Sequence, residues 1–369
     1  MKNLSILIIG AGIGGLTAAI ALRQRGFAVE LIEKDPSGTA YGVGIIQQGN
    51  VLRAVAALGI LDRYIDAGAG FDAVEVYAPH GLKVARVPSP RLLADRPANL
   101  GVSRRALQAV LRESATAAGA TLHLGVTATA LNPGDGEVKL STGAAGRYDL
   151  VIGADGVHSA TRAMIFPEAP LPEFTGQAVW RYNLPRPPGL DALHVYNGPV
   201  GAGLVPIGPE LMYLYLTTAE PDNPRYPRAG LAAQMRAKTA ACAPAIRELA
   251  QAITEDEEVV YRPLESVLLT GPWHHGRVAL LGDAVHCSTP HLGQGGGLAI
   301  EDSLVLAEEL SRHTHLEAAL EAYRARRFER CAYIVRASLA ICMGQLGRGP
   351  AIDNARATAE MFAVTAQPI

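Results

Sequence analysis

Apolar residues recur along the first third of the chain in two alternating rhythms, one typical of buried strands and one of helices. Residues 5–9 form a short apolar run rich in β-branched side chains, which predicts a buried parallel strand. From 16 to 25 the apolar positions follow helical spacing, and Gly26 ends this predicted helix. A second strand is predicted over 29–32. The order strand, helix, strand indicates an α/β fold with a parallel sheet.

The middle of the chain has the two-residue alternation of strands, separated by turns rich in proline and glycine. A hairpin is predicted over 74–87 and an antiparallel sheet over 174–217. Helical spacing follows over 231–254, over 298–310, and from 316 nearly to the end. The expected fold class is therefore α/β: a Rossmann-like domain with an inserted antiparallel-sheet domain and C-terminal helices.

A glycine-rich turn of the form G-x-G-x-x-G directly follows the first predicted strand, with the sequence Gly10-Ala11-Gly12-Ile13-Gly14-Gly15. In this pattern Gly10 permits the tight turn, Gly12 lets backbone N–H groups approach a pyrophosphate, and Gly15 lets the helix pack closely. Glu33 ends the second strand, where a carboxylate can accept hydrogen bonds from a ribose. Together these features predict a dinucleotide site.

Two later turns repeat this form, in which a buried strand runs into glycine and aspartate. The first contains Asp155 and the second contains Asp283. The second turn leads to a glycine loop, 293–297, at a helix start, where backbone N–H groups can stabilise an anion. Arg104 and Arg105 open a further predicted helix, and one of them is a candidate for contacting a diphosphate.

Charge and cysteine content narrow the class of partner. The chain has 369 residues with a formal net charge of −2, so bulk charge does not favour nucleic acid or an anionic membrane. Its 4 cysteines lack metal-binding spacing, and no metal is expected. No apolar run reaches the ~18 residues of a membrane span, and no signal peptide precedes the first strand. We expect a cytoplasmic protein with a small-molecule partner.

The three motifs in this order resemble those of the flavoprotein aromatic hydroxylases of the para-hydroxybenzoate hydroxylase type. The resemblance covers about residues 4–310 and implies FAD as the cofactor and NAD(P)H as the reductant. It assigns FAD binding to residues from all three motifs and from the segments between them: Gly12, Ile13, Gly14, Gly15, Glu33, Lys34, Val43, Arg104, Val126, Asp155, Asp283, Gly293, Gly295 and Gly296.

The chain departs from the family pattern at two places. Many members have asparagine where this chain has Gly297, and the arginine that some members carry before Gly42 is absent. Gly42 and Gly44 are themselves expected to let the backbone lie against a flat ring.

The resemblance also implies a domain division in which FAD-binding segments alternate with substrate-binding segments. The FAD-binding segments are 1–72, 101–172 and 271–310, the substrate domain comprises a hairpin at 73–100 and a sheet at 173–270, and C-terminal helices occupy 311–369.

The implied reaction uses O₂ and a flavin C4a-hydroperoxide to hydroxylate a small phenol-like or hydroxypyridine-like ring. Tyr215 and His291 are candidates to contact or deprotonate the substrate, and Pro290 is expected to shape the pocket. The alternative for Tyr215 is a strand aromatic that fills the core, and the alternative for His291 is a loop-structuring hydrogen bond. Side chains alternate between the two faces of a strand, so only one face of each strand can line the pocket. Four residues of the inserted sheet are further candidates for this lining: Trp180, Arg181, His194 and Tyr196.

Other functions remain open at this stage. The same motifs fit an FAD monooxygenase for a polyketide, antibiotic or isoprenoid, and a flavin redox sensor without turnover. A simple NAD-dependent dehydrogenase does not explain the late Gly-Asp motif. The chain is expected to be a monomer or a homodimer.

Overall fold

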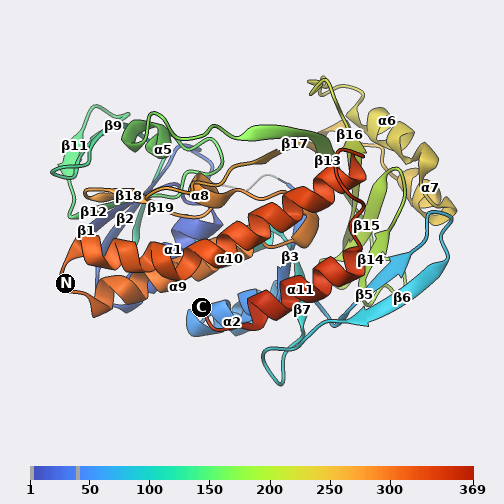
Figure 1. Ribbon diagram of the computed structural model, residues 1–369, viewed down its shortest axis with the longest axis horizontal. Helices are drawn as coiled ribbons and strands as arrows, with labels where there is room; N and C mark the ends of the chain where they lie inside the picture. The colour runs from blue at the N-terminus through green and yellow to red at the C-terminus, as the bar shows by residue number, and fades with distance from the viewer. Residues whose placement is uncertain (1–3, 39–41) are drawn as a thin grey trace.

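The computed structural model describes residues 4–38 and 42–369, and its larger half is built on a six-stranded sheet (Figure 1). The strand order is β18-β19-β12-β1-β2-β8, and all neighbours are parallel except β18 and β19. Both faces of the central strands are buried, as the continuous apolar runs predict. The strands are β1 (Ser5–Ile9), β2 (Ala28–Glu33), β8 (Thr121–Leu124), β12 (Leu150–Gly153), β18 (His274–His275) and β19 (Val278–Leu280).

Strands β1, β12 and β19 are adjacent and parallel, so their carboxyl ends meet at one edge of the sheet. Each strand ends in one of the three glycine-and-acid motifs. Backbone bonds join the turns, since Ala154 N–H donates to the Ile9 carbonyl at 2.8 Å and Leu281 N–H donates to the Gly153 carbonyl at 3.0 Å. Residues about 270 positions apart in sequence are therefore neighbours here.

A seven-stranded sheet of order β17-β13-β16-β15-β14-β5-β6 forms the other half, and all its pairs are antiparallel except β14 with β5. The predicted hairpin 74–87 joins this sheet at its edge, about 100 residues before the other strands. The strands are β5 (Ala73–Tyr77), β6 (Lys83–Pro88), β13 (Glu173–Pro185), β14 (Leu193–Tyr196), β15 (Gly201–Pro206), β16 (Leu211–Ala219) and β17 (Val260–Ser266).

One face of this sheet is closed by two short helices, α6 (Leu231–Lys238) and α7 (Pro244–Ala250), which lie beyond the sheet in Figure 1. Alternation along β13 places Trp180 and Tyr182 on this closed face, in a core that includes Leu214 and Leu216. The residues between them, such as Arg181, point to the opposite face. That opposite face borders the cavity described below.

Smaller sheets and the remaining helices connect and cover the two halves. One small sheet, of order β3-β7-β4, bridges the halves. Its strands are β3 (Gly44–Gln48), β4 (Gly68–Phe71) and β7 (Asn99–Ser103), and those of the second are β9 (Ala128–Asn132), β10 (Glu137–Leu140) and β11 (Ala145–Arg147). The helices are α1 (Ile13–Gln24), α2 (Gly49–Ala57), α3 (Leu61–Asp66), α4 (Arg104–Ala117), α5 (Ala160–Ile165), α8 (Asp283–His286), α9 (Gly295–Arg312), α10 (Leu316–Gln345) and α11 (Asn354–Ala366).

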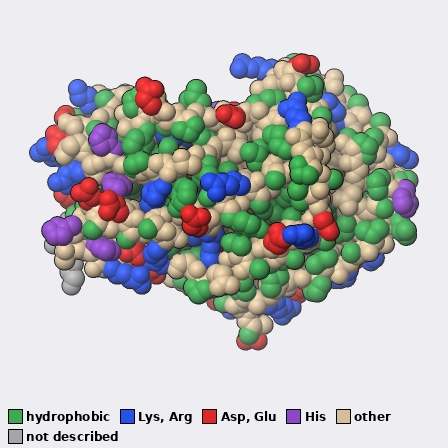
Figure 2. Space-filling view, in the orientation of Figure 1, with side chains coloured by type: hydrophobic (Ala, Val, Ile, Leu, Met, Phe, Trp, Pro, Cys, Tyr) green, Lys and Arg blue, Asp and Glu red, His purple; other side chains and the backbone are tan. Residues whose placement is uncertain are grey.

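Helix α10 runs diagonally across the molecule from the first half to the second, and α11 folds back below it (Figure 1). Three arginines hold the C-terminal residues by their carbonyl groups. Arg53 donates to the Ala366 carbonyl, Arg330 to the Gln367 carbonyl and Arg326 to the Ile369 carbonyl, each at 2.8 Å. This anchoring fixes α11 against α2. On the face shown in Figure 2, charged side chains gather mainly over the half that is built on the six-stranded sheet, at the left of the view.

The helix predicted from residue 298 begins earlier than expected. Helix α9 starts at Gly295, because the glycines of the loop form its first turn. A Cβ on Gly297 would lie 2.5 Å from Val51 Cγ2, so α2 occupies the space of the asparagine found in many family members. The predicted cap of α4 is confirmed, since Ser103 Oγ accepts from Ala106 N–H at 3.1 Å. No helix in the described ranges is long and apolar enough to span a membrane.

Candidate active site

The glycines of the first turn are glycine for different reasons: protein packing requires Gly15, whereas Gly12 leaves space for a ligand. A Cβ on Gly15 would lie 1.9 Å from the Gly10 carbonyl oxygen, so the close approach of α1 to the turn requires glycine. A Cβ on Gly12 would meet no atom of the described chain within 4 Å, and the φ of Gly12 is an ordinary −74°. Protein packing therefore does not explain glycine here. The open space at the start of α1 suits a phosphate group.

Glu33 lies beside this turn at the carboxyl end of β2. Its Oε2 accepts from Ala11 N–H at 2.8 Å, and its backbone carbonyl accepts from Val126 N–H at 2.9 Å. Lys34 is exposed next to it. The structure thus brings together Glu33, Lys34 and Val126, three of the residues that the sequence assigned to FAD binding.

A cavity of about 380 Å³ begins at the Gly-Asp turn and the glycine loop. Asp283, Arg104, Gly293, Gly295 and Gly296 line this end of it. Protein surrounds the Asp283 carboxyl, and this burial raises its pKa, although its side chain is open to the cavity. Burial lowers the pKa of Arg104, and the nearby Asp283 opposes that shift. Arg105 is exposed, so Arg104 is the arginine that faces the site.

The cavity continues to the open face of the seven-stranded sheet, where Tyr213, Tyr215, Thr217, Val179 and Arg181 line it. Arg181 of β13 lies directly opposite Tyr215 of β16 in the register of the sheet. Burial raises the pKa of Tyr215 above its usual 10, so this phenol keeps its proton at neutral pH. Tyr215 is therefore suited to donate a hydrogen bond and is poorly suited to act as a base.

His291 and Pro290 also line the cavity. His291 Nε2 lies 3.2 Å from Gln345 Oε1 and its Nδ1 lies 2.9 Å from Thr289 Oγ1. Because the amide oxygen only accepts, Nε2 carries the proton and Nδ1 accepts from the threonine hydroxyl. Burial lowers the pKa of His291 to about 4. This geometry favours the interpretation of a loop-structuring histidine over that of a base.

Sequence comparison identifies the family. The profile described as "FAD binding domain" matches residues 3–338. The chain belongs to this family of FAD-binding proteins. The aurachin C monooxygenase/isomerase of Stigmatella aurantiaca is 33% identical over 94% of this chain and 90% of its own length.

Solved structures of FAD-dependent relatives have the same fold. Klebsiella pneumoniae HpxO complexed with FAD and uric acid superposes with a TM-score of 0.83 at 25% identity, covering 98% of this chain and 92% of that one. The tetrameric form of 2-methyl-3-hydroxypyridine-5-carboxylic acid oxygenase gives a TM-score of 0.82 at 26% identity, covering 98% and 96%. The chain is an FAD-dependent monooxygenase, and its cofactors are FAD and NAD(P)H.

The residues at the three turns fit FAD. Gly12 leaves a cradle open to a phosphate, and Arg104 supplies a positive charge at the cofactor end of the cavity. Ser288 Oγ lines the cavity beside Gly295, is buried, and has no hydrogen-bond partner among the residues that the structure describes. A buried hydroxyl without a partner is costly, so Ser288 is a further candidate to contact the cofactor. Nothing in its local sequence singled it out.

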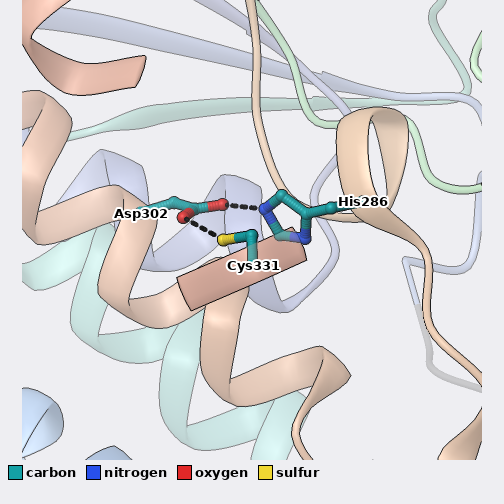
Figure 3. A group of neighbouring side chains, drawn as sticks. All are labelled: His286, Asp302 and Cys331. Atoms are coloured by element: carbon teal, nitrogen blue, oxygen red, sulfur yellow. Dashed lines mark hydrogen bonds and ion pairs between the residues drawn. The ribbon is translucent and has the colours of Figure 1, made fainter. Parts of the chain in front are cut away.

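A buried polar cluster supports the Gly-Asp turn from below (Figure 3). His286 Nε2 lies 2.7 Å from Asp302 Oδ2, which also accepts from Gly282 N–H at 3.1 Å, and Cys331 Sγ points at Oδ1 of the same carboxylate. Burial opposes a charge on His286, but the neighbouring sulfur and carboxylate outweigh it and raise its pKa. This histidine belongs to the structure of the turn rather than to the cavity.

His286, Asp302 and Cys331 lie as close together as the ligands of a metal ion, but the guanidinium of Arg327 already supplies the positive charge beside Asp302. Its Nε donates to Asp302 Oδ1 at 2.8 Å, and its Nη1 lies 2.8 Å from Glu301 Oε2. All three of these charged side chains are fully buried. The guanidinium already neutralises the carboxylate, so the cluster serves to hold α9, α10 and the turn together.

Several sequence-based candidates do not reach the cavity. The Asp155 carboxylate accepts from the Thr161 backbone N–H and hydroxyl, each at 2.9 Å, and so is used within its own turn. Trp180 is buried on the closed face of the sheet, while His194 and Tyr196 pack around Tyr77 on the same side, as alternation requires. Of the four proposed sheet residues, only Arg181 lines the cavity.

The structure adds a packing reason for glycine in the Gly42–Gly44 segment, which was expected to let the backbone lie against a flat ring. A Cβ on Gly44 would lie 2.5 Å from Tyr213 Cδ1, so a tyrosine ring packs on this backbone. Val43 is buried, and its carbonyl accepts from Arg104 N–H at 2.8 Å. The segment thereby positions the start of α4, while residues 39–41, which precede it, lie outside the described residues.

Sequence patterns missed the wall of the cavity formed by the C-terminus. One face of α11 contributes four side chains at helical spacing, Asn354, Thr358, Met361 and Phe362. Helix α10 adds Ile341 and Gln345. The amphipathic pattern of α11 signals a buried face but does not say what that face covers.

Proposed function

We propose that this chain hydroxylates a small aromatic or heteroaromatic ring, consuming NAD(P)H and O₂. One observation carries the proposal: a single cavity extends from the Gly-Asp turn, where Asp283 and Arg104 lie, to Arg181 and Tyr215 on the sheet. A ring held against the sheet would therefore face the reactive part of FAD. The relatives support this choice, since HpxO is complexed with uric acid and another neighbour acts on a hydroxypyridine carboxylic acid.

The cofactor residues have distinct roles in this proposal. The start of α1 at Gly12 receives the pyrophosphate, and Glu33 with Lys34 and Val126 surrounds the adenosine end. Asp283 and Arg104 hold the middle of the cofactor. Backbone N–H groups of the glycine loop face the ring: Gly293 lies just before α9, and Gly295 and Gly296 lie in its first turn.

FAD, when bound, supplies the redox and oxygen chemistry, whereas the chain binds and orients the substrate and excludes water. Tyr215 donates a hydrogen bond to a substrate oxygen, because its phenol stays protonated. Pro290 and His291 shape the wall beside the ring. The substrate's own hydroxyl loses its proton to water at the cavity mouth in this proposal, because both tyrosines hold their protons and His291, with its pKa lowered to about 4, is too weak a base.

A panel of phenols, hydroxypyridines and hydroxyquinolines tests the proposed reaction. A true substrate should accelerate NAD(P)H oxidation with matching O₂ uptake, and its product should contain one additional oxygen atom. A purified protein without bound FAD, or without ring-stimulated oxidation across the panel, would contradict the proposal. Stimulation only by a polyketide or isoprenoid would support the alternative substrate class, and no stimulation by any compound would favour a flavin sensor.

Arg104 and Arg105 provide a matched pair for the cofactor assignment. Arg104→Gln removes a charge that faces the cavity and should weaken FAD binding by about 10- to 100-fold, the contribution of one charge-assisted hydrogen bond. Arg105→Gln removes an exposed charge and should leave FAD binding unchanged. Equal effects of the two substitutions on FAD affinity would refute the assignment.

The domain division rests on the two large sheets. The hairpin β5–β6 and the strands from β13 to β17 share one sheet, and the segments between them carry the cofactor residues. The proposal also includes a cytoplasmic location and a monomeric or homodimeric state. Size-exclusion chromatography with light scattering will test the oligomeric state.

A further inference from the structure

We propose that Gln345, the last residue of α10, determines substrate specificity by donating a hydrogen bond from its side-chain amide to a neutral acceptor on the substrate. The acceptor is a ring nitrogen or a carbonyl oxygen. This inference rests on the proposed function and specifies the substrate class for the same cavity. Its basis is a chain of hydrogen bonds that decides which end of the Gln345 amide is left open.

The amide oxygen of Gln345 is already used within the protein. Gln177 Nε2 donates to Gln345 Oε1 at 2.9 Å, and His291 Nε2 lies 3.2 Å from the same oxygen. The amide nitrogen of Gln345 makes no hydrogen bond to any residue in 4–38 or 42–369. Gln345 is exposed and lines the cavity. An amide nitrogen carries two N–H donors, so these donors are available to a bound molecule.

The direction of this chain is fixed at its buried end. Gln177 and Cys342 are both buried, and Cys342 Sγ donates to Gln177 Oε1 at 3.4 Å. Burial raises the pKa of the Cys342 thiol, so the thiol keeps the proton that it donates. Because sulfur is only a weak acceptor, turning the Gln177 amide around would place its N–H groups against a poor partner. Gln177 therefore presents its nitrogen to Gln345, whose oxygen accepts.

His291 completes the chain on the cavity side. Since the Gln345 oxygen only accepts, His291 carries its proton on Nε2, and its Nδ1 accepts from the Thr289 hydroxyl at 2.9 Å. Burial lowers the pKa of His291 to about 4, so the ring is neutral and has one proton to donate. Two donors thus hold the oxygen of the Gln345 amide, and its nitrogen is the end left for a ligand.

The surroundings of this open donor suit a flat ring. Gln177 and Val179 are two residues apart on β13 and so share the face of the strand that borders the cavity. Val179 lies opposite Thr217 of β16, which also lines the cavity, and Ile341 lines it one helical turn before Gln345. A neutral donor beside apolar side chains fixes the orientation of a ring through an acceptor at its edge.

The flavin ring offers other neutral acceptors, because it has carbonyl oxygens of its own. In the proposed function the glycine loop before α9 faces the flavin. Gln345 is instead tied through Gln177 to β13 of the seven-stranded sheet, the half assigned to the substrate. This connection favours the substrate as the acceptor, and the experiment below distinguishes the two.

The test compares pairs of rings that differ only in an acceptor, such as a hydroxyquinoline with the matching naphthol and a hydroxyacetophenone with the matching ethylphenol. Each ring is titrated into the FAD-loaded enzyme, and binding is followed by the change in flavin absorbance. The acceptor preference is the Kd of the ring without the acceptor divided by the Kd of its partner. Comparing this ratio between variants cancels the difference in hydrophobicity within each pair.

The preference of wild type should exceed that of Gln345→Met by about 2- to 10-fold, the contribution of one neutral hydrogen bond. Gln345→Glu keeps the size of the side chain and an accepting oxygen but has no N–H group. It should therefore lower the preference at least as far as Gln345→Met does. Gln177→Met removes the bond that orients the amide and should lower the preference in part.

Two controls make the result specific. Gln234→Met replaces an exposed glutamine on α6, outside the cavity lining, and should leave the preference intact. The Kd for FAD, measured on the apoprotein without any ring, should be the same in Gln345→Met and wild type. Equal FAD content shows that each variant is folded.

Heteronuclear NMR of isotopically labelled histidine side chains tests the direction of the chain without any ring or turnover. At neutral pH, His291 should carry its proton on Nε2, and His291→Asn identifies its signal. A proton on Nδ1 instead would mean that the Gln345 amide is turned around, and it would overturn the inference.

The titrations separate the remaining hypotheses. An unchanged preference in Gln345→Met overturns the donor site, and so does a variant that raises only the Kd for FAD, because the flavin would then be the acceptor. Ring turnover without an acceptor preference overturns this inference and keeps the proposed reaction. Because binding needs no turnover, an acceptor preference without oxygenated product refutes the proposed reaction and keeps the donor site. No binding of any ring overturns both.

Discussion

Replacing Gly12 with alanine should separate cofactor binding from folding. Its Cβ would meet no protein atom within 4 Å, and its φ of −74° suits any residue. The free energy of unfolding of the apoprotein should therefore change by less than about 1 kcal/mol, and a small gain is expected because alanine restricts the unfolded chain. The methyl group would instead occupy the approach of the pyrophosphate to the N-terminus of α1.

The loss of binding is set by the hydrogen bonds that the phosphate would forfeit. Each charge-assisted bond from a backbone N–H contributes about 1.5–3 kcal/mol, which corresponds to roughly 10- to 100-fold in Kd for one bond. We expect the Kd for FAD of Gly12→Ala to rise by at least this factor. Titration of the apoprotein with FAD, followed by quenching of flavin fluorescence, measures it.

Gly15→Ala is the matched comparison three residues later. Its Cβ would lie 1.9 Å from the Gly10 carbonyl oxygen, so the turn or the helix must move. Overpacking of this kind costs about 1–3 kcal/mol or more, and apoprotein unfolding in urea should show it. The reasoning fails if Gly12→Ala destabilises the apoprotein as much as Gly15→Ala does, or if Gly12→Ala binds FAD like wild type.

Three further substitutions test the buried cluster, the cavity histidine and the packing of the wall. Arg327→Met should lower the free energy of unfolding by about 3–5 kcal/mol, because two fully buried carboxylates lose their shared cation; a urea midpoint equal to that of the exposed-pair control Arg356→Gln would refute this. Burial lowers the pKa of His291 to about 4, so the unfolded chain binds more protons between pH 4 and its ordinary 6.5. Wild type should therefore lose stability on acidification through that window and His291→Asn should lose less; parallel pH profiles would contradict this. Gly44→Val should displace the Tyr213 ring, because a Cβ at Gly44 would lie 2.5 Å from that ring. The substitution should therefore raise the Kd for the substrate more than the Kd for FAD. A larger rise for FAD in the two titrations would count against this packing.

The cofactor half was predictable because its signals are local. Each glycine turn lies within a few residues of the strand that precedes it, and backbone chemistry alone gives Gly12 and Glu33 their roles. The Ser103 cap and the hairpin over 74–87 were predictable for the same reason. Adjacent parallel strands then bring the turns together, which follows from the fold class once the strands are recognised.

The sequence could not predict what Gly44 and Gly297 pack against, and the reason is the same for both. Glycine indicates that a side chain is not tolerated, but it does not say which neighbour excludes it. At Gly44 the neighbour is Tyr213, from a strand about 170 residues later, and at Gly297 it is Val51 of α2. Only the packed structure identifies these atoms.

The sequence by itself determined the fold class, the family and the cofactor, because short motifs with fixed spacing encode backbone turns that bind phosphates. The tertiary structure alone decided which polar side chains line the cavity. Strand alternation places Trp180 and Arg181 on opposite faces of the sheet but does not show which face lines the cavity. Helices α6 and α7 cover the face that carries Trp180, and this leaves Arg181 at the cavity. The helices that cover one face of the sheet come from residues far away in sequence, so the place of Arg181 at the cavity is a property of the folded chain.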